Sequence, residues 1–289
     1  RFGASAPGPV LFERFGFTDI AYAYEPVAAA FFFARQLTAD ATVLVADFGG
    51  GTSDFSLVRF ERRDGVMRSA PLSNAGVGLA GDAFDYRIID NLVSPALGKG
   101  TSYASFGKIL PVPNRYYAAF ARWEQLALLR GSKTLAEIRR LVRQALDPDR
   151  IEKLVELLED NHGYRLYQSV SALKEALSAD DTATFEFRAG SIVIEREVKR
   201  ETFERWIAPE LAAMSGAVDE ALARAGLTPE QVDKVFLTGG TSFVPAVRRL
   251  FADRFGAAKL EAGGELVSIA TGLALMAGEP DLEMWTSRA

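Results

Sequence analysis

One segment constrains the fold more than any other part of this 289-residue chain. Residues 42–47 form a continuous apolar run that ends in an acid, and three glycines and an alternating segment, 52–60, come directly after it. A continuous apolar run is typical of a strand buried on both faces, whereas alternation is typical of a strand with one polar face. The sequence therefore predicts a β-hairpin in a buried sheet, with a glycine turn at its tip.

This glycine turn has the residue types that phosphate binding needs. Gly49, Gly50 and Gly51 let backbone N–H groups approach phosphate oxygens without interference from a Cβ atom. Asp47, at the end of the strand, is placed to hold magnesium through water, because magnesium keeps part of its hydration shell. Thr52 supplies a hydroxyl for a phosphate oxygen. The alternative interpretation is a tight hairpin whose glycines only satisfy turn geometry.

A second junction between a strand and glycines lies late in the chain. Residues 235–237 are a short apolar strand pattern that runs into Gly239 and Gly240, and residues 245–255 have the spacing of an amphipathic helix. A helix N-terminus has unpaired N–H donors and the positive end of the helix dipole, so it attracts phosphate or accepts ribose hydroxyls. Such turns are common, and this one alone is equally consistent with a structural role.

Sheet and helix patterns alternate along the rest of the chain, which favours an α/β fold with a helical insertion. A helix is expected from Gly78, and a Gly, Ser and Pro-rich connection, 95–113, leads into a helical module at 115–177. A long helix, 200–224, is expected to kink or break at Pro209. Further strand patterns lie at 19–24 and 66–73 and, as a hairpin, at 184–188 and 192–198; further helical patterns lie at 27–37 and 266–276.

The composition excludes several kinds of partner and site. A net charge of -5 leaves no basic surface of the kind that nucleic acids or anionic membranes select, so we expect neither as a partner. The absence of cysteine rules out disulfides and thiolate metal sites and fits a cytoplasmic protein. The most apolar stretch, 27–33, is far shorter than the roughly 20 residues of a membrane span. The single histidine, His162, lies in a polar break between helices, which favours a structural role.

A competing motif lies at residues 76–81, which have the G-x-G-x-x-G spacing of dinucleotide-binding loops. A dinucleotide site also needs an acid about 20 residues further on, at the end of a second strand. Residues 95–100 contain no acid, so this interpretation is disfavoured. A Walker-type loop is absent from the sequence as well.

Four motifs occur in the order found in the seventy-kilodalton heat-shock (DnaK-like) chaperones, and the chain resembles that family over most of its length. They are the Glu25-Pro26 junction, the D-x-G-G-G-T-x-D hairpin at 47–54, the glycine-started helix with Phe84-Asp85, and the G-G-T-S-x-x-P turn at 239–245. The segment 160–164 before Lys174 is more similar to the YegD-like branch, which lacks a peptide-binding domain.

The resemblance implies an α/β fold, namely an actin-like ATPase (ribonuclease H-like) lobe with a helical plus β-hairpin cap subdomain. Residues 1–40 would be a remnant of the first lobe and its crossing helix. Residues 41–90 and 199–280 would form the core of the nucleotide-binding lobe, and 91–198 the inserted, mostly helical cap.

The resemblance also implies ATP or ADP with magnesium as the ligand. Glu25 would lie at the crossing between the lobes, near the attacking water and the metal, and Asp47 would be the second acid beside the metal. The other matching residues would contact nucleotide: Gly49, Gly50, Gly51 and Thr52 at the β and γ phosphates, Gly239, Gly240 and Thr241 at the ribose and α-phosphate, Gly81 on the ribose side, Lys174 and Ser178 at the nucleoside, and Phe243 at the base.

Several positions depart from the family pattern. Glu175 and Phe243 stand where the chaperones have an arginine pair flanking adenine, and only Phe243 could stack on a base. Ser171 and Ala83 stand where the family has acids, and Leu266 falls near an expected aspartate. The family's first phosphate hairpin and catalytic lysine would precede residue 1, so we expect no appreciable ATP hydrolysis by this chain alone.

Three functions follow from these observations. The leading one is an ATP-binding, heat-shock-70-like chaperone domain in which nucleotide drives lobe closure, with client or co-chaperone proteins as partners. The second is a non-hydrolysing nucleotide sensor or pseudo-ATPase that acts as an interaction module. The third is a sugar or acetate kinase with the same two-lobed fold, although no residue here identifies an acceptor pocket.

Overall fold

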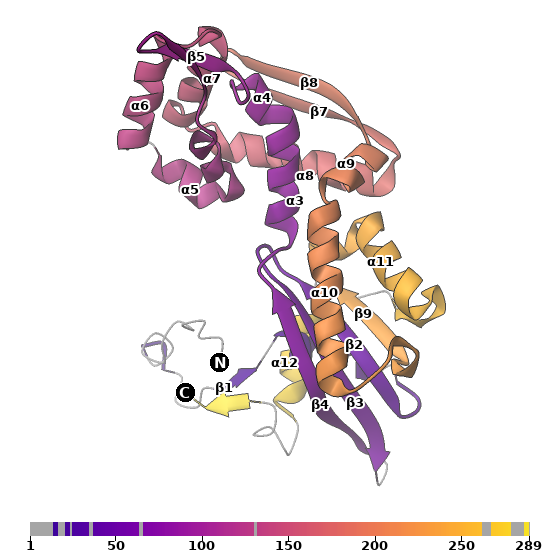
Figure 1. Cartoon of the computed structure of the whole chain (residues 1–289). Helices are drawn as coiled ribbons and strands as arrows, with labels where there is room; N and C mark the ends of the chain where they lie inside the picture. Colours follow the sequence, from indigo (N-terminus) through magenta and orange to yellow (C-terminus); the bar gives the residue numbers. More distant parts are fainter. Residues whose placement is uncertain are drawn as a thin grey trace.

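The computed structural model describes residues 14–16, 21–23, 25–34, 37–63, 66–129, 132–261, 267–278 and 286–288. A part built on a β-sheet lies at one end of the molecule and a largely helical part at the other (Figure 1). Two helices, α3 (Gly81–Ile88) and α10 (Ala208–Ala225), run between these parts.

The central sheet has five strands in the order β10-β9-β2-β3-β4. Its first three strands along the chain pair as an antiparallel meander, and the last two add in parallel on the other side of β2. The strands are β2 (Ala41–Phe48), β3 (Ser53–Arg63), β4 (Val66–Val77), β9 (Lys234–Thr238) and β10 (Leu260–Glu261). The predicted α/β class and the hairpin around the glycine turn are confirmed.

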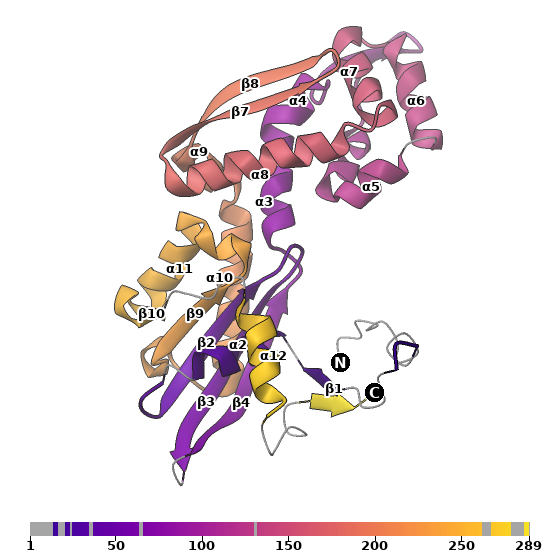
Figure 2. The ribbon, with the colours of Figure 1, turned by 180° about the vertical axis from the view of Figure 1, so that it is seen from behind.

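Strand β2 is buried along its whole length because helices cover both faces of the sheet. Val43 and Val45 pack with α2 (Glu25–Ala34), and α12 (Ser268–Met276) packs on α2 (Figure 2). Leu44 and Ala46 belong to the core on the opposite face, which α10 and α11 (Pro245–Phe255) cover. Each fully buried Val or Leu side chain contributes about 1.5–3 kcal/mol, so this continuous apolar run specifies the centre of the sheet.

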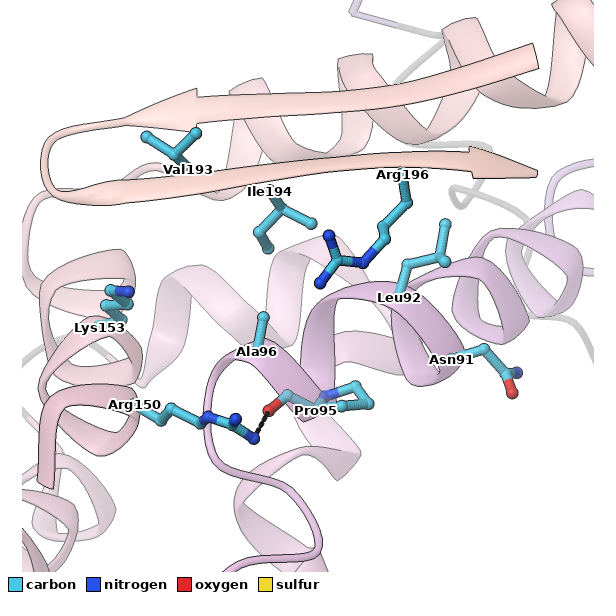
Figure 3. A pocket seen from close by; sticks show the side chains of 9 residues that line it. All are labelled: Asn91, Leu92, Pro95, Ala96, Arg150, Lys153, Val193, Ile194 and Arg196. Carbon is cyan, nitrogen blue, oxygen red and sulfur yellow. Dashed lines mark hydrogen bonds between the residues drawn. The ribbon is translucent and has the colours of Figure 1, made fainter. Parts of the chain in front are cut away.

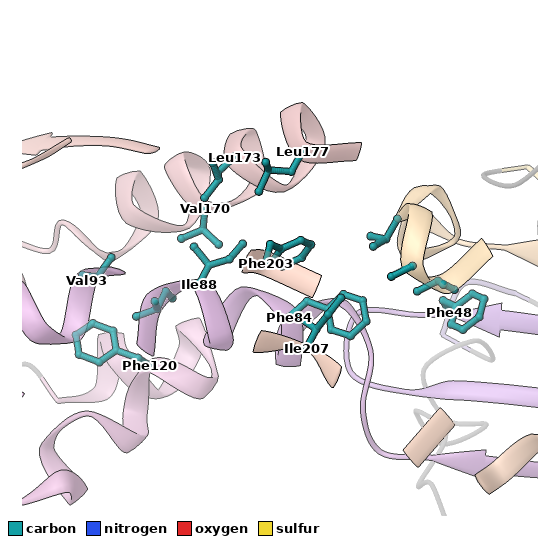
Figure 4. Packing of buried hydrophobic residues seen from close by; sticks show 14 of the residues in the cluster. Phe48, Phe84, Ile88, Val93, Phe120, Val170, Leu173, Leu177, Phe203 and Ile207 are labelled. Carbon is teal, nitrogen blue, oxygen red and sulfur yellow. The ribbon is translucent and has the colours of Figure 1, made fainter. Parts of the chain in front are cut away.

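The helical part is a single insertion between β4 and α10. Its core continues from α3 into the packed side chains of Ile88, Val170, Leu173 and Phe203, as Figure 4 shows. Its elements after α3 are a π-helical segment η1 (Ile89–Val93), α4 (Ser94–Ala96), β5 (Ser102–Ser105), β6 (Lys108–Pro111), 3-10 turns η2 (Asn114–Tyr116) and η3 (Ala118–Ala121), α5 (Trp123–Leu128), α6 (Lys133–Val142), α7 (Pro148–Glu159), α8 (Gly163–Ala179), β7 (Thr182–Ala189), β8 (Ile192–Lys199) and α9 (Arg200–Trp206).

Several element predictions are confirmed here. The expected hairpin forms as β7 and β8, which pair antiparallel. The expected break in the long helix falls at Ile207, between α9 and α10, with Pro209 in the first turn of α10. Gly226 ends α10 in the left-handed conformation, with a φ of 66°. His162 lies between α7 and α8, as expected for a polar break.

Other elements differ from the predictions. The connection at 95–113 contains a short hairpin, β5 and β6. Apolar residues such as Ile109 are exposed there, so the sequence lacks the alternation of apolar and polar residues that would indicate these strands. The helix expected from Gly78 begins at Gly81, because β4 continues to Val77 and the Ser53 hydroxyl donates to the carbonyl of Leu79, 2.6 Å away. A 3-10 turn, η5 (Gly240–Phe243), separates β9 from α11.

Two short strands lie apart from the central sheet. Strand β1 (Ala21–Ala23) pairs antiparallel with β11 (Thr286–Arg288), which joins residues from the two ends of the chain (Figure 1). The predicted helix at 27–37 begins two residues earlier, at Glu25, and its described part ends at Ala34. Among the described residues, none of the helices has the length and apolar character that a bilayer crossing requires.

Candidate functional site

Three carboxylates meet where β2 ends. Asp47 is the penultimate residue of β2 and is only 4% exposed, and the strand register places Asp54 of β3 directly opposite. Glu25, the first residue of α2, lies within hydrogen-bonding reach of the Asp47 side chain, so the two carboxyl groups can share one proton. Burial first, and then the negative charges of Glu25 and Asp54, raise the pKa of Asp47 from 3.8 to about 6. This clustering of hard oxygen donors suits a divalent cation such as magnesium.

The glycine turn is an exposed loop fixed to the start of α3. Gly49 N donates to the carbonyl of Thr52 at 2.9 Å, which closes the turn. Asp82 N donates to the carbonyl of Gly50 at 2.8 Å, and a Cβ atom at Gly50 would lie 3.4 Å from the Asp82 carboxylate. The hydrogen bond from Asp82 N therefore joins the predicted phosphate loop to the N-terminus of α3.

Three of the predicted nucleotide-binding residues converge at the first residue of α3. A Cβ atom at Gly81 would lie 3.1 Å from Thr241 Oγ1 and 3.6 Å from Lys174 Nζ. Lys174 Nζ also pairs with Asp85 Oδ1 of α3 at 2.7 Å. Burial raises the pKa of Asp85, and the charge of Lys174 offsets part of that shift. Glycine at position 81 thus keeps open a small space between α3, α8 and η5.

Gly239 brings the end of β9 against the end of β2. Its backbone has φ 85° and ψ 160°, a region that essentially only glycine occupies. A Cβ atom there would lie 2.0 Å from the carbonyl oxygen of Phe48, so no side chain fits. The Ser242 hydroxyl donates to the Gly239 carbonyl at 2.6 Å and holds the turn. Gly240 is open to solvent, with no atom near its Cβ position.

The remaining predicted residues lie around this centre without a contact that would assign them a role. The Ser178 hydroxyl donates to the Lys174 carbonyl at 2.9 Å, one turn back along α8. The Phe243 ring is 45% exposed, and Glu175 is exposed. Gly51 and Thr52 are exposed at the tip of the glycine turn. Leu266 falls outside the described residues.

Sequence reasoning gave no role to three acids that the structure brings to the site. Asp54 raises the pKa of Asp47, Asp82 lies against Gly50, and Asp85 pairs with Lys174. Asp54 carried a usable signal, because a four-residue turn after Phe48 puts it opposite Asp47 in the hairpin register. Asp82 and Asp85 depend on where α3 begins and on how α8 crosses it, which no local pattern indicates.

The geometry also disfavours the dinucleotide interpretation of residues 76–81. Gly76 lies inside β4, which runs antiparallel to β3. A dinucleotide loop joins two parallel strands through a helix that packs back on the sheet. Helix α3 instead leads away from the sheet into the helical part (Figure 1).

A mixed sheet of this order, with a helical cap inserted after the meander, is the α/β lobe of an actin-like ATPase nucleotide-binding domain, as predicted. The family model described as Hsp70 protein matches residues 20–100 and 139–279, which is more than half of the chain. The chain therefore belongs to the Hsp70 protein family.

Individual relatives agree with this assignment. The chain is 27% identical over 254 residues to the chaperone protein DnaK of Thermus thermophilus, covering 88% of this chain and 34% of that protein. It is 28% identical over 256 residues to DnaK of Deinococcus deserti, covering 88% and 33%. It is 30% identical over 105 residues to a heat shock protein homolog of Lachancea kluyveri, covering 35% and 15%. The chain thus spans about a third of the length of the DnaK relatives.

Proposed function

We propose that this chain binds ATP or ADP with magnesium at the end of β2, as part of a cytoplasmic Hsp70-like chaperone, and that nucleotide drives lobe closure across Glu25 and Asp47. The observation that supports this best is the meeting of two glycine turns, at Gly50 and Gly239, with the start of α3 and the carboxylate cluster around the buried Asp47. Client or co-chaperone proteins would respond to the closure.

The residues present fit such a ligand. Gly50, Gly51 and Thr52 would receive phosphates through their backbone N–H groups, since no Cβ atom covers the glycines, while Gly49 N and Asp82 N keep their carbonyl partners within the protein. Asp47, with Glu25 and Asp54 beside it, would hold magnesium through water, and the cation would neutralise the repulsion within the cluster. Bound magnesium would supply charge neutralisation for phosphoryl transfer, while Glu25 would orient the attacking water.

A second function, a non-hydrolysing nucleotide sensor, is favoured by one observation. The two positions expected beside adenine have an exposed acid, Glu175, and a half-exposed ring, Phe243, in place of cations. Such a pocket would hold the base less firmly, so binding without turnover would suffice for an interaction module. We also propose that the protein belongs to the YegD-like branch, on the sequence of residues 160–164.

Calorimetric titration tests both functions. ATP and ADP are titrated, with and without magnesium, into this chain and into any longer natural form of the protein. Magnesium-dependent binding supports the nucleotide site, and single-turnover hydrolysis by the longer form then separates a switch that hydrolyses ATP from a sensor. A complete lack of nucleotide binding by both forms would contradict the proposal.

Asp47→Asn examines the cation role directly. We expect this variant to weaken magnesium-dependent nucleotide binding more than magnesium-free binding. Asp253→Asn is the matched control, because it removes the same charge from an exposed position on α11. An equal loss with and without magnesium in Asp47→Asn would count against the role of Asp47.

A further inference from the structure

A pocket of about 330 Å³ lies in the helical cap, away from the end of β2. Strand β8 forms one wall, η1 and α4 form another, and α7 closes the side, as Figure 3 shows. None of the residues that line it belongs to the candidate nucleotide site. Volumes of this size are at the lower end of the range for small-molecule sites.

The pocket is lined by three cations and by no acid. Arg150 and Lys153 lie one turn apart on α7, and Arg196 extends from β8 into the space between Ile194 and Leu92 (Figure 3). Arg196 Nη1 donates to a main-chain carbonyl, that of Glu195, at 2.9 Å. In the part of the chain that the structure describes, no salt bridge joins Lys153 or Arg196 to a carboxylate.

Two carboxylates lie near these cations. One of them pairs with a cation of the pocket, and the other accepts hydrogen bonds from a residue outside the lining. Asp147 Oδ2 lies 3.0 Å from Arg150 Nε, and Arg150 Nη1 reaches the Pro95 carbonyl at 3.4 Å. The two oxygens of Glu156 accept hydrogen bonds from Ser191 N and Ser191 Oγ, and these bonds lower the pKa of Glu156 more than the charge of Lys153 does. The lining residues themselves therefore contribute three cations and no acid, and Arg150 pairs with a carboxylate outside the lining, that of Asp147.

The remaining walls are apolar and locally irregular. Leu92, Ala96 and Ile194 give the pocket an apolar lining between the charged groups (Figure 3). Leu92 belongs to η1, the π-helical segment that continues α3, and π-helical turns are frequent at functional sites. The pocket therefore combines a limited volume, an apolar lining and converging N–H donors, as binding sites for small anions do.

We propose that this pocket binds a small polyanion, a compound with a phosphate group or several carboxylates on a short carbon skeleton. Arg196 and Lys153 would contact the anionic groups from two sides, and Arg150 would exchange its carbonyl contact for the ligand. The apolar lining would receive the carbon skeleton. This site is independent of the nucleotide site at the end of β2.

The test is calorimetric titration at low ionic strength with inorganic pyrophosphate and with citrate as the two probes. No nucleotide is added, because ADP is itself a polyanion and would compete for the pocket; the pocket variants below distinguish probe binding here from binding at the candidate nucleotide site. Tighter binding of pyrophosphate would assign the ligand to phosphate compounds, and tighter binding of citrate would assign it to polycarboxylates. No binding of either probe at millimolar concentration would overturn the proposal.

Two double variants distinguish binding in this pocket from nonspecific attraction between the anionic probe and the charged surface of the protein. Lys153→Gln with Arg196→Gln is expected to weaken probe binding about tenfold or more, because it removes two charged donors. The control, Arg140→Gln with Arg143→Gln, removes the same charge from exposed positions on or next to α6 and should change affinity by less than about twofold. Equal losses in both double variants would overturn the proposal.

Ala96→Phe changes the volume of the pocket and leaves the charge of the protein unchanged. Because Ala96 points into the space beneath Ile194 and Arg196 (Figure 3), a ring there should abolish probe binding. Thermal unfolding of this variant checks that the cap stays folded, and the charge variants decide the matter if it does not. Unchanged binding in a folded Ala96→Phe protein would contradict the proposed location.

Discussion

Individual residues at the end of β2 are constrained in two ways, by close contact between main-chain segments and by repulsion between charges. Gly239 has a backbone conformation closed to other residues and lies against the Phe48 carbonyl. Asp47 is buried beside two other acids, which costs free energy whenever it is ionised without a cation. Both features cost stability, a pattern found where function rather than stability selects the residue.

Gly239→Ala should lower the free energy of unfolding by roughly 2–4 kcal/mol, because it adds backbone strain and a clash with a main-chain carbonyl. Urea unfolding followed by circular dichroism measures the change. Gly240→Ala is the control, since that position has a negative φ and open space around it, and it should change stability by less than about 0.5 kcal/mol. Similar effects at the two positions would refute the steric argument.

Asp47→Asn should stabilise the protein at neutral pH when divalent cations are removed. The folded-state pKa of Asp47 is about 6, above its ordinary value of 3.8, so the folded state holds the proton more tightly than the unfolded state. Stability is therefore lost as pH rises from about 4 to about 6. We expect Asp47→Asn to recover about 1–2 kcal/mol at pH 7, after allowance for solvent screening, and almost none below pH 4. Urea unfolding in EDTA across this range measures it, and a pH-independent difference would contradict the pKa shift.

Helix contacts decide how the layers fit together. Helices α2 and α12 approach so closely that a Cβ atom at Gly272 would lie 1.7 Å from the Ala28 carbonyl oxygen. Ala28, Ala29 and Ala30 are fully or almost fully buried and keep the α2 surface flat. Helices α3 and α8 are instead joined by the Asp85–Lys174 ion pair, beside Gly81.

Two helical glycines should respond to alanine with opposite signs. Gly272→Ala forces α12 away from α2 and should lower the free energy of unfolding by about 1–3 kcal/mol. Gly216 lies in α10 with no atom near its Cβ position. Because alanine has the better helix propensity, Gly216→Ala should raise the free energy of unfolding by about 0.5–1 kcal/mol. Thermal unfolding of both variants measures the difference. Destabilisation by Gly216→Ala as large as that by Gly272→Ala would show that packing is not the cause.

Lys174→Met should leave Asp85 buried without its cation and destabilise the protein by about 2 kcal/mol. The double variant Lys174→Met with Asp85→Leu removes both charges and should restore most of that loss, because two apolar side chains can pack where an ion pair was desolvated. A double-variant cycle by urea unfolding gives the coupling. Additive losses would mean that the two side chains do not stabilise each other.

Taken together, the fold places the candidate site at the junction of its two parts. Helix α3 begins beside the glycine turn and runs into the cap, and α10 returns from the cap to cover the sheet (Figure 1). A change in the glycine turn would therefore reach the cap through a rigid element, without passing through a loop.

Glu25→Ala separates catalysis from binding in a form of the protein that hydrolyses ATP. If Glu25 orients the attacking water, turnover should fall about 100-fold while the Kd for ATP stays within about threefold. Single-turnover hydrolysis and calorimetry provide the two measurements, with Glu186→Ala, at an exposed position on β7, as a control for turnover. A large loss of affinity in Glu25→Ala would show that Glu25 is a structural residue of the carboxylate cluster.

The local sequence was sufficient wherever a single element defines a feature. Burial pattern and turn geometry depend on only a few consecutive residues. The local sequence therefore predicts the apolar run of β2, the glycine turn after Asp47, the β7–β8 hairpin and the helix break before Pro209. The start of α3 and the β5–β6 hairpin were not predicted correctly, because distant hydrogen bonds and exposed apolar residues override the local pattern.

Relations between distant residues emerged only when the chain folded. The sequence identified Glu25, Asp47, Gly81, Lys174 and Thr241 by pattern or resemblance, but not that Glu25 would raise the pKa of Asp47 or that Lys174 and Thr241 would meet at Gly81. The basic pocket of the cap has no sequence signal at all, since Arg150 and Arg196 come from separate elements. Periodicity records which face of an element is buried, whereas the packing of elements decides which charges and backbone atoms become neighbours.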